Sequence, residues 1–378
     1  MRNKIMRTMV IGVVVAVFCT ALIGCGNDSK ATQGTGETNE AVMDETISDK
    51  VASSGLNVEI PDSYEKENDS VSFKADVVVA SEVREKGLQR LTASLQKPNP
   101  EKVLECLMGN TEVKEKNEEE NNYWYVGAND ESLTINNTSI GFANKFYVYV
   151  SNAFRLQQGY SDYNADKYDL DKDLEFASRQ QAFDDIRQTL KTMGIEAGDQ
   201  YKCYVLEHST LQSEEYAMDM NGNVDQASYK ESWTQDDDSY YFVINQEYDD
   251  TPAYHVFYDN FPLVADENAP IQVLYNKAGI QFLQVEKMFR FEEQEGNYEL
   301  KPFEEIAGVL ETKYGMLLNG STYFVNRATL YYMANKTGEG QYEVIPVWIF
   351  NTVDSESGKV LQDIINAQTG EEIIWEEK

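Results

Sequence analysis

The pattern of hydrophobic and polar positions predicts a chain made mostly of β-strands. Apolar and polar side chains alternate over residues 71–79, as expected for a strand with one buried face. Two further apolar segments, residues 56–60 and 146–150, are predicted as strands, and the glutamate-rich segment 112–122 as an exposed loop. Runs rich in aromatic and β-branched residues, which favour strands, occur at 123–126, 133–135, 201–206, 240–244, 322–334 and 342–350.

Helical periodicity is confined to three short segments, residues 99–109, 178–194 and 302–315. Ser178, followed by Gln181 three positions later, forms the capping-box pattern that begins a helix. A glycine stands at the end of each segment, where a helix commonly stops. Few short helices, many strands and no regular alternation of strand and helix predict an α+β fold with antiparallel sheets, each packed with short helices.

The predicted elements follow the order hairpin, helix, strand, strand twice, in residues 123–246 and 271–351. The second stretch begins with a hairpin whose four-residue loop spans 276–279. The residues of the two stretches do not align convincingly, so two similar halves and one mixed domain with similar units both remain open. We place the domain boundary after residue 250, giving α+β domains over 56–250 and 251–378.

Charge restricts the partners of this 378-residue chain. It has 32 Lys and Arg against 65 Asp and Glu, a formal net charge of −33. Such an acidic surface repels phosphate backbones, so we expect no nucleic-acid partner. Hydrophobic residues make up 42% and aromatic residues 12%, which is too apolar for a disordered chain.

The N-terminus has the composition of an export signal. Arg2, Lys4 and Arg7 precede a weakly polar to apolar stretch over residues 9–23, as in the positive and apolar regions of secretory signals. Residues 26–55 contain no aromatic residue and are rich in polar and acidic side chains. We therefore expect a signal peptide over 1–24 and a flexible tether over 25–55.

Leu22-Ile23-Gly24-Cys25 resembles the lipobox of bacterial lipoproteins. The resemblance implies that Cys25 receives a diacylglyceryl group and that the preceding residues are removed. Fatty acyl chains, palmitate among them, would then hold the protein at the extracytoplasmic face of the cell membrane. A plain transmembrane anchor, or a signal cut elsewhere, is the alternative. The whole chain resembles uncharacterised lipoproteins of Gram-positive gut bacteria, which implies a location but no activity.

The C-terminal segments 344–350 (VIPVWIF) and 364–373 (IINAQTGEEI) resemble the end of PepSY-type domains and YycI-like regulatory proteins. In those proteins a strand containing Pro-Val-Trp pairs with a hairpin whose turn reads Asn/Asp-Ala-x-Thr-Gly-Glu. The chain departs from the YycI pattern because its lipid anchor replaces an N-terminal transmembrane helix. The resemblance implies a regulatory or interaction role.

The residue types needed for catalysis are scarce. The two histidines, His208 and His255, are too few and too far apart for a zinc site, and both are interpreted as structural. Cys106 and Cys203 are interpreted as buried free thiols, although a disulfide between them remains open. We therefore expect no catalytic residue, no metal ligand, no cofactor and no enzymatic activity.

Two acidic segments begin like calcium-binding EF-hand loops, at Asp162 and at Asp219. The first has Lys167 and the second Val224 where the loop requires glycine. Solvated acidic loops are the better interpretation of both, with calcium binding left open. The run 236–238 of three aspartates is likewise interpreted as a solvated turn.

These observations favour a cell-surface lipoprotein without catalytic activity that acts as an envelope interaction or regulatory module. Its partners would be the membrane, through Cys25, and another envelope protein. The alternative is a surface lipoprotein that binds a glycan or peptide ligand. Most of the 24 tyrosines are expected in the core, and a hollow with three or more exposed Tyr or Trp rings would favour the alternative.

Cys25→Ala tests the anchor. Without a thiol to accept the diacylglyceryl group, the variant is expected to remain unprocessed or to leave the membrane fraction. Fractionation followed by immunoblotting measures both outcomes. Normal processing and retention of the variant would contradict lipidation at Cys25.

Overall fold

The computed structural model describes residues 55–156, 163–216, 224–225, 228–255, 269–317, 320–338 and 340–374. The predicted signal peptide, Cys25 and nearly all of the tether lie outside these residues, as do Asp162 and Asp219 of the calcium-like segments. Within the described ranges, no helix is long and apolar enough to cross a membrane.

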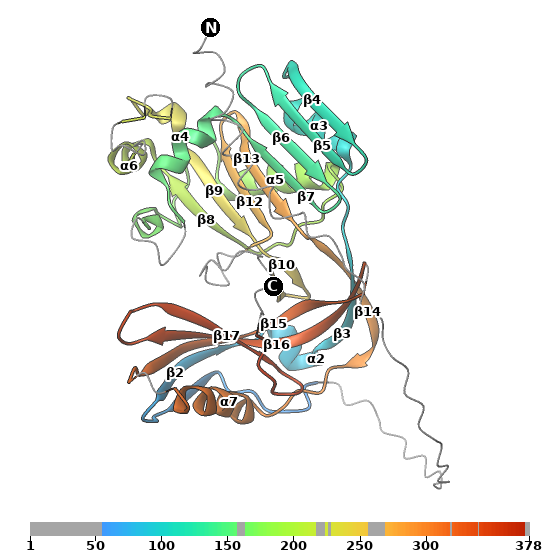
Figure 1. The fold of residues 1–378 in the computed structure, drawn as a ribbon, viewed down its shortest axis with the longest axis vertical. Helices are drawn as coiled ribbons and strands as arrows, with labels where there is room; N and C mark the ends of the chain where they lie inside the picture. Colours follow the sequence, from blue (N-terminus) through green and yellow to red (C-terminus); the bar gives the residue numbers. More distant parts are fainter. Residues whose placement is uncertain are drawn as a thin grey trace. The chain divides into compact units, whose positions relative to one another are not determined.

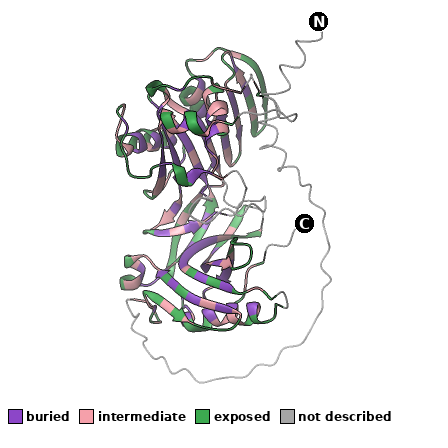
Figure 2. Cartoon of the chain, turned by 90° about the vertical axis from the view of Figure 1, so that its left-hand side faces the viewer, coloured by how far each residue is buried: buried purple, intermediate pink, exposed green. Residues whose placement is uncertain are grey.

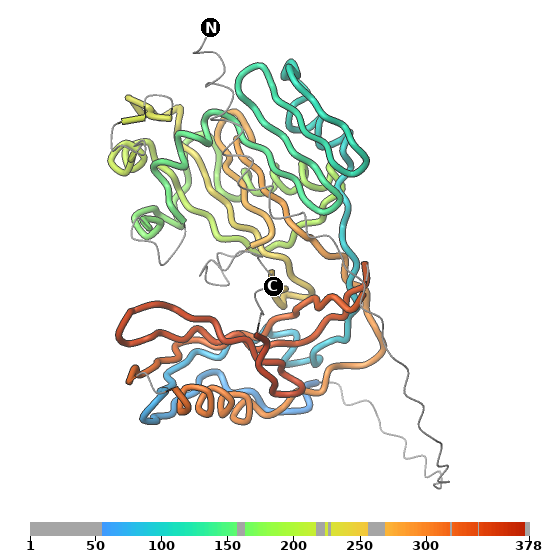
Figure 3. Tube along the Cα trace, viewed as in Figure 1, coloured from blue at the N-terminus to red at the C-terminus, as the bar shows by residue number. Residues whose placement is uncertain are grey.

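Two sheets with helices packed on them form the described part of the chain, which confirms the α+β class. Sheet A has nine strands: β1 (Ser63–Lys66), β2 (Val71–Val78), β3 (Gln89–Leu95), β10 (Gln246–Tyr248), β11 (Thr251–Tyr254), β14 (Phe289–Asn297), β15 (Tyr323–Gly338), β16 (Gln341–Asp354) and β17 (Val360–Asn366). Its main path runs β1-β2-β15-β16-β3-β14. Figure 3 shows that this sheet combines the blue beginning and the red end of the described chain.

The long β15–β16 hairpin is the centre of sheet A. Near its open end β15 pairs with β2 and β16 pairs with β17, whereas farther along β15 pairs with β11 and β16 with β3. The β2–β15 and β11–β15 pairs are parallel, so sheet A is mixed rather than purely antiparallel as predicted. Parallel pairing requires a long connection between the paired strands. Here β2 and β15 are separated by most of the chain.

Helix α7 (Phe303–Gly315) covers the core of sheet A, and α2 (Ser81–Lys86) adds Val83 to that core. Trp348 is fully buried, and its ring meets Phe303 edge-on at 4.9 Å between centroids. Beside them the buried Asp363 carboxylate accepts hydrogen bonds from Thr352 Oγ1 (2.6 Å) and Tyr314 Oη (2.8 Å). The buried acid thus ties α7 to β16 and β17.

The C-terminal motif forms a paired strand followed by a tight turn. β16 carries Pro346 and Trp348 and pairs with β17. In the turn that follows, Asn366 Oδ1 accepts the backbone N–H of Gln368 at 2.8 Å, and Gly370 has a φ of 75°. Pro346, which has no N–H to donate, lies between the part of β16 that pairs with β3 and the part that pairs with β17.

Sheet B has eight strands in the order β4-β5-β6-β7-β13-β12-β9-β8. They are β4 (Val113–Glu119), β5 (Asn122–Gly127), β6 (Ser132–Asn136), β7 (Ser139–Ala143), β8 (Tyr201–Leu206), β9 (Ser239–Ile244), β12 (Ile271–Asn276) and β13 (Gly279–Glu286). Every pair is antiparallel, so residues in register form rows across one face. Buried and exposed positions alternate along several of these strands (Figure 2).

Helices cover the two faces of sheet B differently. Helices α3 (Pro100–Met108) and α5 (Arg179–Thr192) pack on one face, where α5 begins with the predicted capping box of Ser178 and Gln181. Helices α4 (Lys145–Ala153) and α6 (His208–Glu214) pack on the other face, over β8, β9, β12 and β13 (Figure 1). Sheet B is also flanked by two single-turn helices, η2 (Ala165–Lys167) and η3 (Gln235–Asp237).

Three of the connections between the sheets are hydrogen-bonded to one another. Gln96, after β3, donates its side-chain N–H to the Phe289 carbonyl at 2.9 Å, and its backbone N–H to the Met288 carbonyl at 2.8 Å. Gln246, just after β9, accepts the Phe289 N–H at 2.9 Å. Gln96 also exchanges two bonds with the backbone of Glu196 (2.8 and 3.3 Å). Both glutamines are buried, so these bonds are protected from water.

Two predicted strands and one predicted loop are wrong. Residues 56–60 form no strand, and residues 146–150 lie in α4, where Asn144 caps the helix by accepting the N–H groups of Phe146 and Tyr147. The predicted loop 112–122 contains β4, whose charged residues form an edge of sheet B. Charged side chains are what exposed edge strands commonly use to prevent further pairing.

The predicted hairpin at 276–279 has a loop of two residues instead of four. The side chain of Asn276 accepts the N–H of Ala278 at 2.8 Å, and Gly279, with φ of 100°, already pairs with Asn276. After this hairpin the chain leaves sheet B, because β13 belongs to sheet B and the next strand, β14, to sheet A.

Helices α5 and α7 each pack on a different sheet, as predicted. The boundary after residue 250 nevertheless falls inside the β10–β11 hairpin and does not separate the sheets. Sheet B takes β12 and β13 from beyond that boundary, and sheet A takes β1, β2 and β3 from before it. The repeated order of elements therefore does not correspond to two consecutive halves.

Gln96→Leu is expected to lower the free energy of unfolding by about 1–3 kcal/mol, because it removes the side-chain partners of the Glu196 N–H and carbonyl. The Phe289 carbonyl loses one of its two side-chain donors and keeps the other, Gln246. Urea unfolding followed by circular dichroism measures the change. The matched control is Gln89→Leu, which removes solvent-accessible bonds to the backbone of β14 and should cost under about 0.5 kcal/mol. Equal effects of the two substitutions would show that the buried bonds contribute no special stability.

Candidate functional site: a tyrosine- and proline-lined groove

A groove of about 770 Å³ lies between the start of α3 and strands β4 and β5. This volume is within the range of small-ligand sites. The lining combines aromatic, aliphatic and charged side chains: Lys97, Pro98, Asn99, Pro100, Glu101, Leu104, Glu118, Tyr123 and Tyr125.

Local sequence rules place both walls of the groove. Tyr123 and Tyr125 are two positions apart on β5, so both point to the face that α3 covers. On the other wall, Asn99 caps α3 by accepting the Lys102 N–H at 3.2 Å, and Pro100 occupies the first helical turn, where its missing N–H costs nothing. The Asn99 N–H donates to the Met193 carbonyl at 2.9 Å, which ties this wall to the end of α5.

Glu118 gives the groove a negative charge. Its carboxylate pairs with Lys116 at 3.2 Å and accepts the Tyr125 hydroxyl at 3.1 Å, and these two contacts lower the pKa of Glu118. Burial, together with the neighbouring Glu118, raises the pKa of Tyr125 to about 12, so the phenol remains a donor at neutral pH. Exposed Glu101 adds a second acid and exposed Lys97 one base.

This lining suits binding. Half-buried Tyr123 offers a ring face, the prolines and Leu104 offer apolar contacts, and the carboxylates attract cationic groups. No histidine, cysteine or serine lines the groove. The sequence showed the alternation of Tyr123 and Tyr125 but not the groove, because its second wall comes from tertiary packing of α3.

His208 is hydrogen-bonded to a buried acid that no pattern in the sequence indicates. Asp238 accepts both the backbone N–H and the Nδ1 of His208, each at 2.7 Å, while the imidazole stays partly exposed. The prediction that residues 236–238 form a solvated turn is therefore wrong for Asp238, which is buried. Its carboxylate joins the start of α6 to the start of β9.

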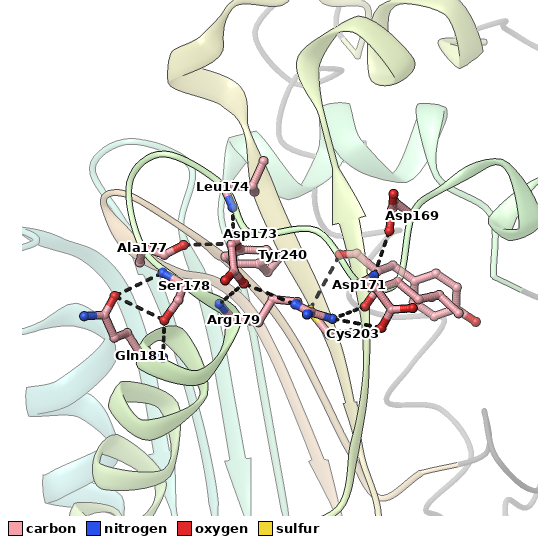
Figure 4. A network of polar contacts seen from close by, with 12 residues as sticks. Asp169, Asp171, Asp173, Leu174, Ala177, Ser178, Arg179, Gln181, Cys203 and Tyr240 are labelled. Atoms are coloured by element: carbon pink, nitrogen blue, oxygen red, sulfur yellow. Dashed lines mark hydrogen bonds and ion pairs between the residues drawn. The ribbon is translucent and has the colours of Figure 1, made fainter.

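The acids before α5 also have structural partners (Figure 4). Asp173 pairs with Arg179 at 3.2 Å and accepts its backbone N–H at 3.0 Å, and these contacts lower the pKa of Asp173. Tyr240 donates its hydroxyl to the Ala177 carbonyl at 2.8 Å. These contacts hold the segment leading into α5, so Asp173 serves as an anchor for that segment.

Cys106 and Cys203 are both free thiols. Cys203 is buried as predicted, and burial raises its pKa, whereas Cys106 lies exposed on α3, contrary to expectation. Within the described ranges, no three His, Cys, Asp or Glu side chains gather closely enough to hold a metal ion.

Comparisons with known proteins identify a fold. The crystal structure of an uncharacterized protein from Eubacterium rectale matches with a TM-score of 0.58 at 18% identity, covering 84% of this chain and 94% of that one. The YpeB C-terminal domain of Bacillus megaterium matches with a TM-score of 0.28 at 8% identity, covering 73% of this chain and 96% of that one. No protein-family model and no curated protein matches the chain. The Eubacterium rectale protein therefore shares the overall fold.

Because His255 is buried, part of the free energy of unfolding is expected to be lost in acid. Burial, assisted by the charge of Lys287, lowers the pKa of His255 to about 3 from 6.5, against the opposing effect of the Glu286 carboxylate 4.0 Å from its Nε2. Below pH 6.5 the unfolded chain therefore takes up a proton that the folded chain does not, so stability is lost as the pH falls towards 3.

His255→Gln should remove this component. Between pH 7 and 4.5 the parent is expected to lose about 2–3 kcal/mol more unfolding free energy than the variant, because the loss accumulates below pH 6.5 at about 1.4 kcal/mol per pH unit. Urea titrations at both pH values measure the difference, and all carboxylates are common to the two proteins. His255→Leu provides a second variant, and parallel pH profiles would contradict the buried neutral imidazole.

Proposed function

We propose that this protein is a cell-surface lipoprotein without catalytic activity, held at the membrane through Cys25, that acts as an envelope interaction module. Its partner is another envelope protein, which inserts an extended segment into the groove between α3 and β5. The observation that carries this proposal is the groove itself, which is lined by two tyrosines, two prolines and the carboxylates of Glu101 and Glu118.

The chemistry of the lining favours a basic segment with a proline or aromatic residue. Glu101 and Glu118 attract Lys or Arg side chains, and the chain as a whole carries a net charge of −33. Tyrosine-lined grooves suit extended proline-containing peptides, which lose little conformational entropy on binding. The tether over residues 25–55 would let the groove reach partners near the membrane.

The alternative is a surface lipoprotein that takes a free glycan or peptide into an aromatic hollow. The groove contains two aromatic rings, of which Tyr125 is buried and Tyr123 half-buried. Three exposed rings were the feature expected of a sugar-stacking hollow. The groove therefore favours a peptide segment over a glycan.

Panning of a random dodecapeptide library on the purified protein tests this proposal. The selected peptides should be rich in Lys or Arg next to Pro or an aromatic residue. Fluorescence anisotropy should then show that Tyr123→Ala weakens binding at least about 10-fold, the loss of one well-packed aromatic contact. Glu118→Gln should weaken binding several-fold at low salt and less at high salt.

Arg187→Ala is the control, because Arg187 is a surface residue on α5 outside this groove. Selection of peptides whose binding Tyr123→Ala leaves unchanged would contradict the groove as their site. Selection of acidic peptides would contradict the charge argument.

A further inference from the structure

On the opposite face of sheet B, one row of residues in register is uncharged and accessible. Successive strand pairs align Asn117 with Trp124, Trp124 with Thr134, Thr134 with Gly141, Gly141 with Gln284, and Gln284 with Gln272. We call this row the amide face; it crosses β4, β5, β6, β7, β13 and β12. Asn117, Trp124 and Gly141 are exposed, and the other three residues are partly exposed.

The helices leave this row accessible. Its residues alternate along their strands with residues buried under α3 and α5, so the row points away from those helices. On its own side, α4 packs on the neighbouring row, where the Tyr147 ring stacks on Phe282 at 3.9 Å. Figure 1 shows α4 and α6 at the β8 and β9 end of the sheet rather than over β4, β5 and β6. The amide face is therefore bordered by α4 on one side.

Trp124 lies on this face with no internal role. It is 36% exposed, whereas the other described tryptophans, Trp233 and Trp348, are buried. Within the described residues its indole N–H has no hydrogen-bond partner and its ring no aromatic neighbour. An exposed ring on a flat sheet offers a surface on which the C–H face of a sugar can stack, as aromatic side chains do with other flat groups.

Gln284 and Gln272 are each held by one hydrogen bond to a neighbouring side chain. The other polar atom of each amide group is left for a ligand. Gln284 donates its amide N–H to Glu286 at 2.8 Å, which leaves Oε1 as an acceptor. Gln272 accepts the Tyr241 hydroxyl at 2.6 Å with Oε1, which leaves Nε2 as a donor. Such an acceptor and donor on adjacent strands match the vicinal hydroxyls of a sugar.

Gly141 keeps the middle of the row flat. A Cβ placed there would meet nothing within 4 Å, so the glycine opens a gap between Thr134 and Gln284. Six strands spaced about 4.8 Å apart give a platform about 24 Å long. That length fits an oligosaccharide chain better than a single sugar.

We propose that the amide face binds a neutral polysaccharide chain, which stacks on Trp124 and hydrogen-bonds to Gln284 and Gln272. Charge argues against an anionic ligand: the six residues of the row are uncharged, and the acids that border them on the same face include Glu119 on β4 and Glu286 on β13. The chain as a whole carries a net charge of −33. An anionic glycan would be repelled by that net charge. This binding site lies on the opposite face of sheet B from the groove and is independent of the proposed peptide binding.

Affinity gel electrophoresis of the purified protein tests this proposal. Gels containing glucomannan, xyloglucan or amylopectin supply neutral polysaccharides, and gels containing polygalacturonate supply an anionic one. Retardation by at least one neutral polymer and by no anionic one is expected. Absence of retardation in all the neutral gels, or retardation by the anionic polymer alone, would overturn the proposal.

Two variants locate the ligand. Trp124→Ala should weaken binding at least about 10-fold, the range found for loss of one aromatic stacking contact. Gly141→Val adds a side chain into open space in a strand, so it should fold normally and still reduce binding by blocking the platform. Circular dichroism and thermal unfolding verify that both variants keep the parental fold.

Phe324→Ala is the matched control, because Phe324 is 38% exposed and lies on sheet A. It should leave retardation unchanged, as should Tyr123→Ala in the groove. Retention of parental binding by Trp124→Ala would overturn the proposal. Loss of binding in Tyr123→Ala, with retention in Trp124→Ala, would place the sugar in the groove instead.

Discussion

The structure depends on buried hydrogen bonds where the chain passes between its two sheets. Sheet B is built from residues 113–286, and sheet A takes strands from both sides of this region and from its middle. The chain therefore crosses repeatedly, and Gln96 and Gln246 bond three of the crossings together at Met288 and Phe289. A glutamine side chain suits this position because one amide group both donates and accepts hydrogen bonds. The backbone N–H and C=O groups of a crossing have no neighbouring strand and need such partners.

The α+β class, the capping box of α5 and the ends of α7 could be predicted because they depend on neighbours in the sequence. The assignment of strands to sheets could not. The β2–β15 pair joins residues about 250 positions apart, and β13 and β14, separated by two residues, enter different sheets. Strands that are distant in the sequence pair because this buries their hydrophobic faces together. The pattern of residues within one strand does not show which other strand will be its partner.

The errors at 112–122 and 146–150 have the same origin. β4 is a strand because β5 pairs with it, although its own residues are charged and typical of a loop. Residues 146–150 have the composition of a strand, but the Asn144 cap and packing of Val150 and Tyr147 on sheet B select a helix. For the candidate site the alternation of Tyr123 and Tyr125 was visible in the sequence. The wall from α3 and the partnership of Asp238 with His208 were not, because both come from tertiary contacts.

The three residues Tyr123-Trp124-Tyr125 connect the two proposed binding surfaces. Since successive side chains of a strand point to opposite faces, the tyrosines line the groove and the tryptophan lies on the amide face. A one-residue shift of β5 against β6 would reverse both placements. Tyr123 and Tyr125, the register partners of Ile135 and Leu133, would then point to the opposite face of the sheet. The buried core under α3 and α5 disfavours that shift, because Leu133 and Ile135 are fully buried and Tyr125 belongs to the same core. The same packing that stabilises sheet B therefore also sets which aromatic ring each surface presents.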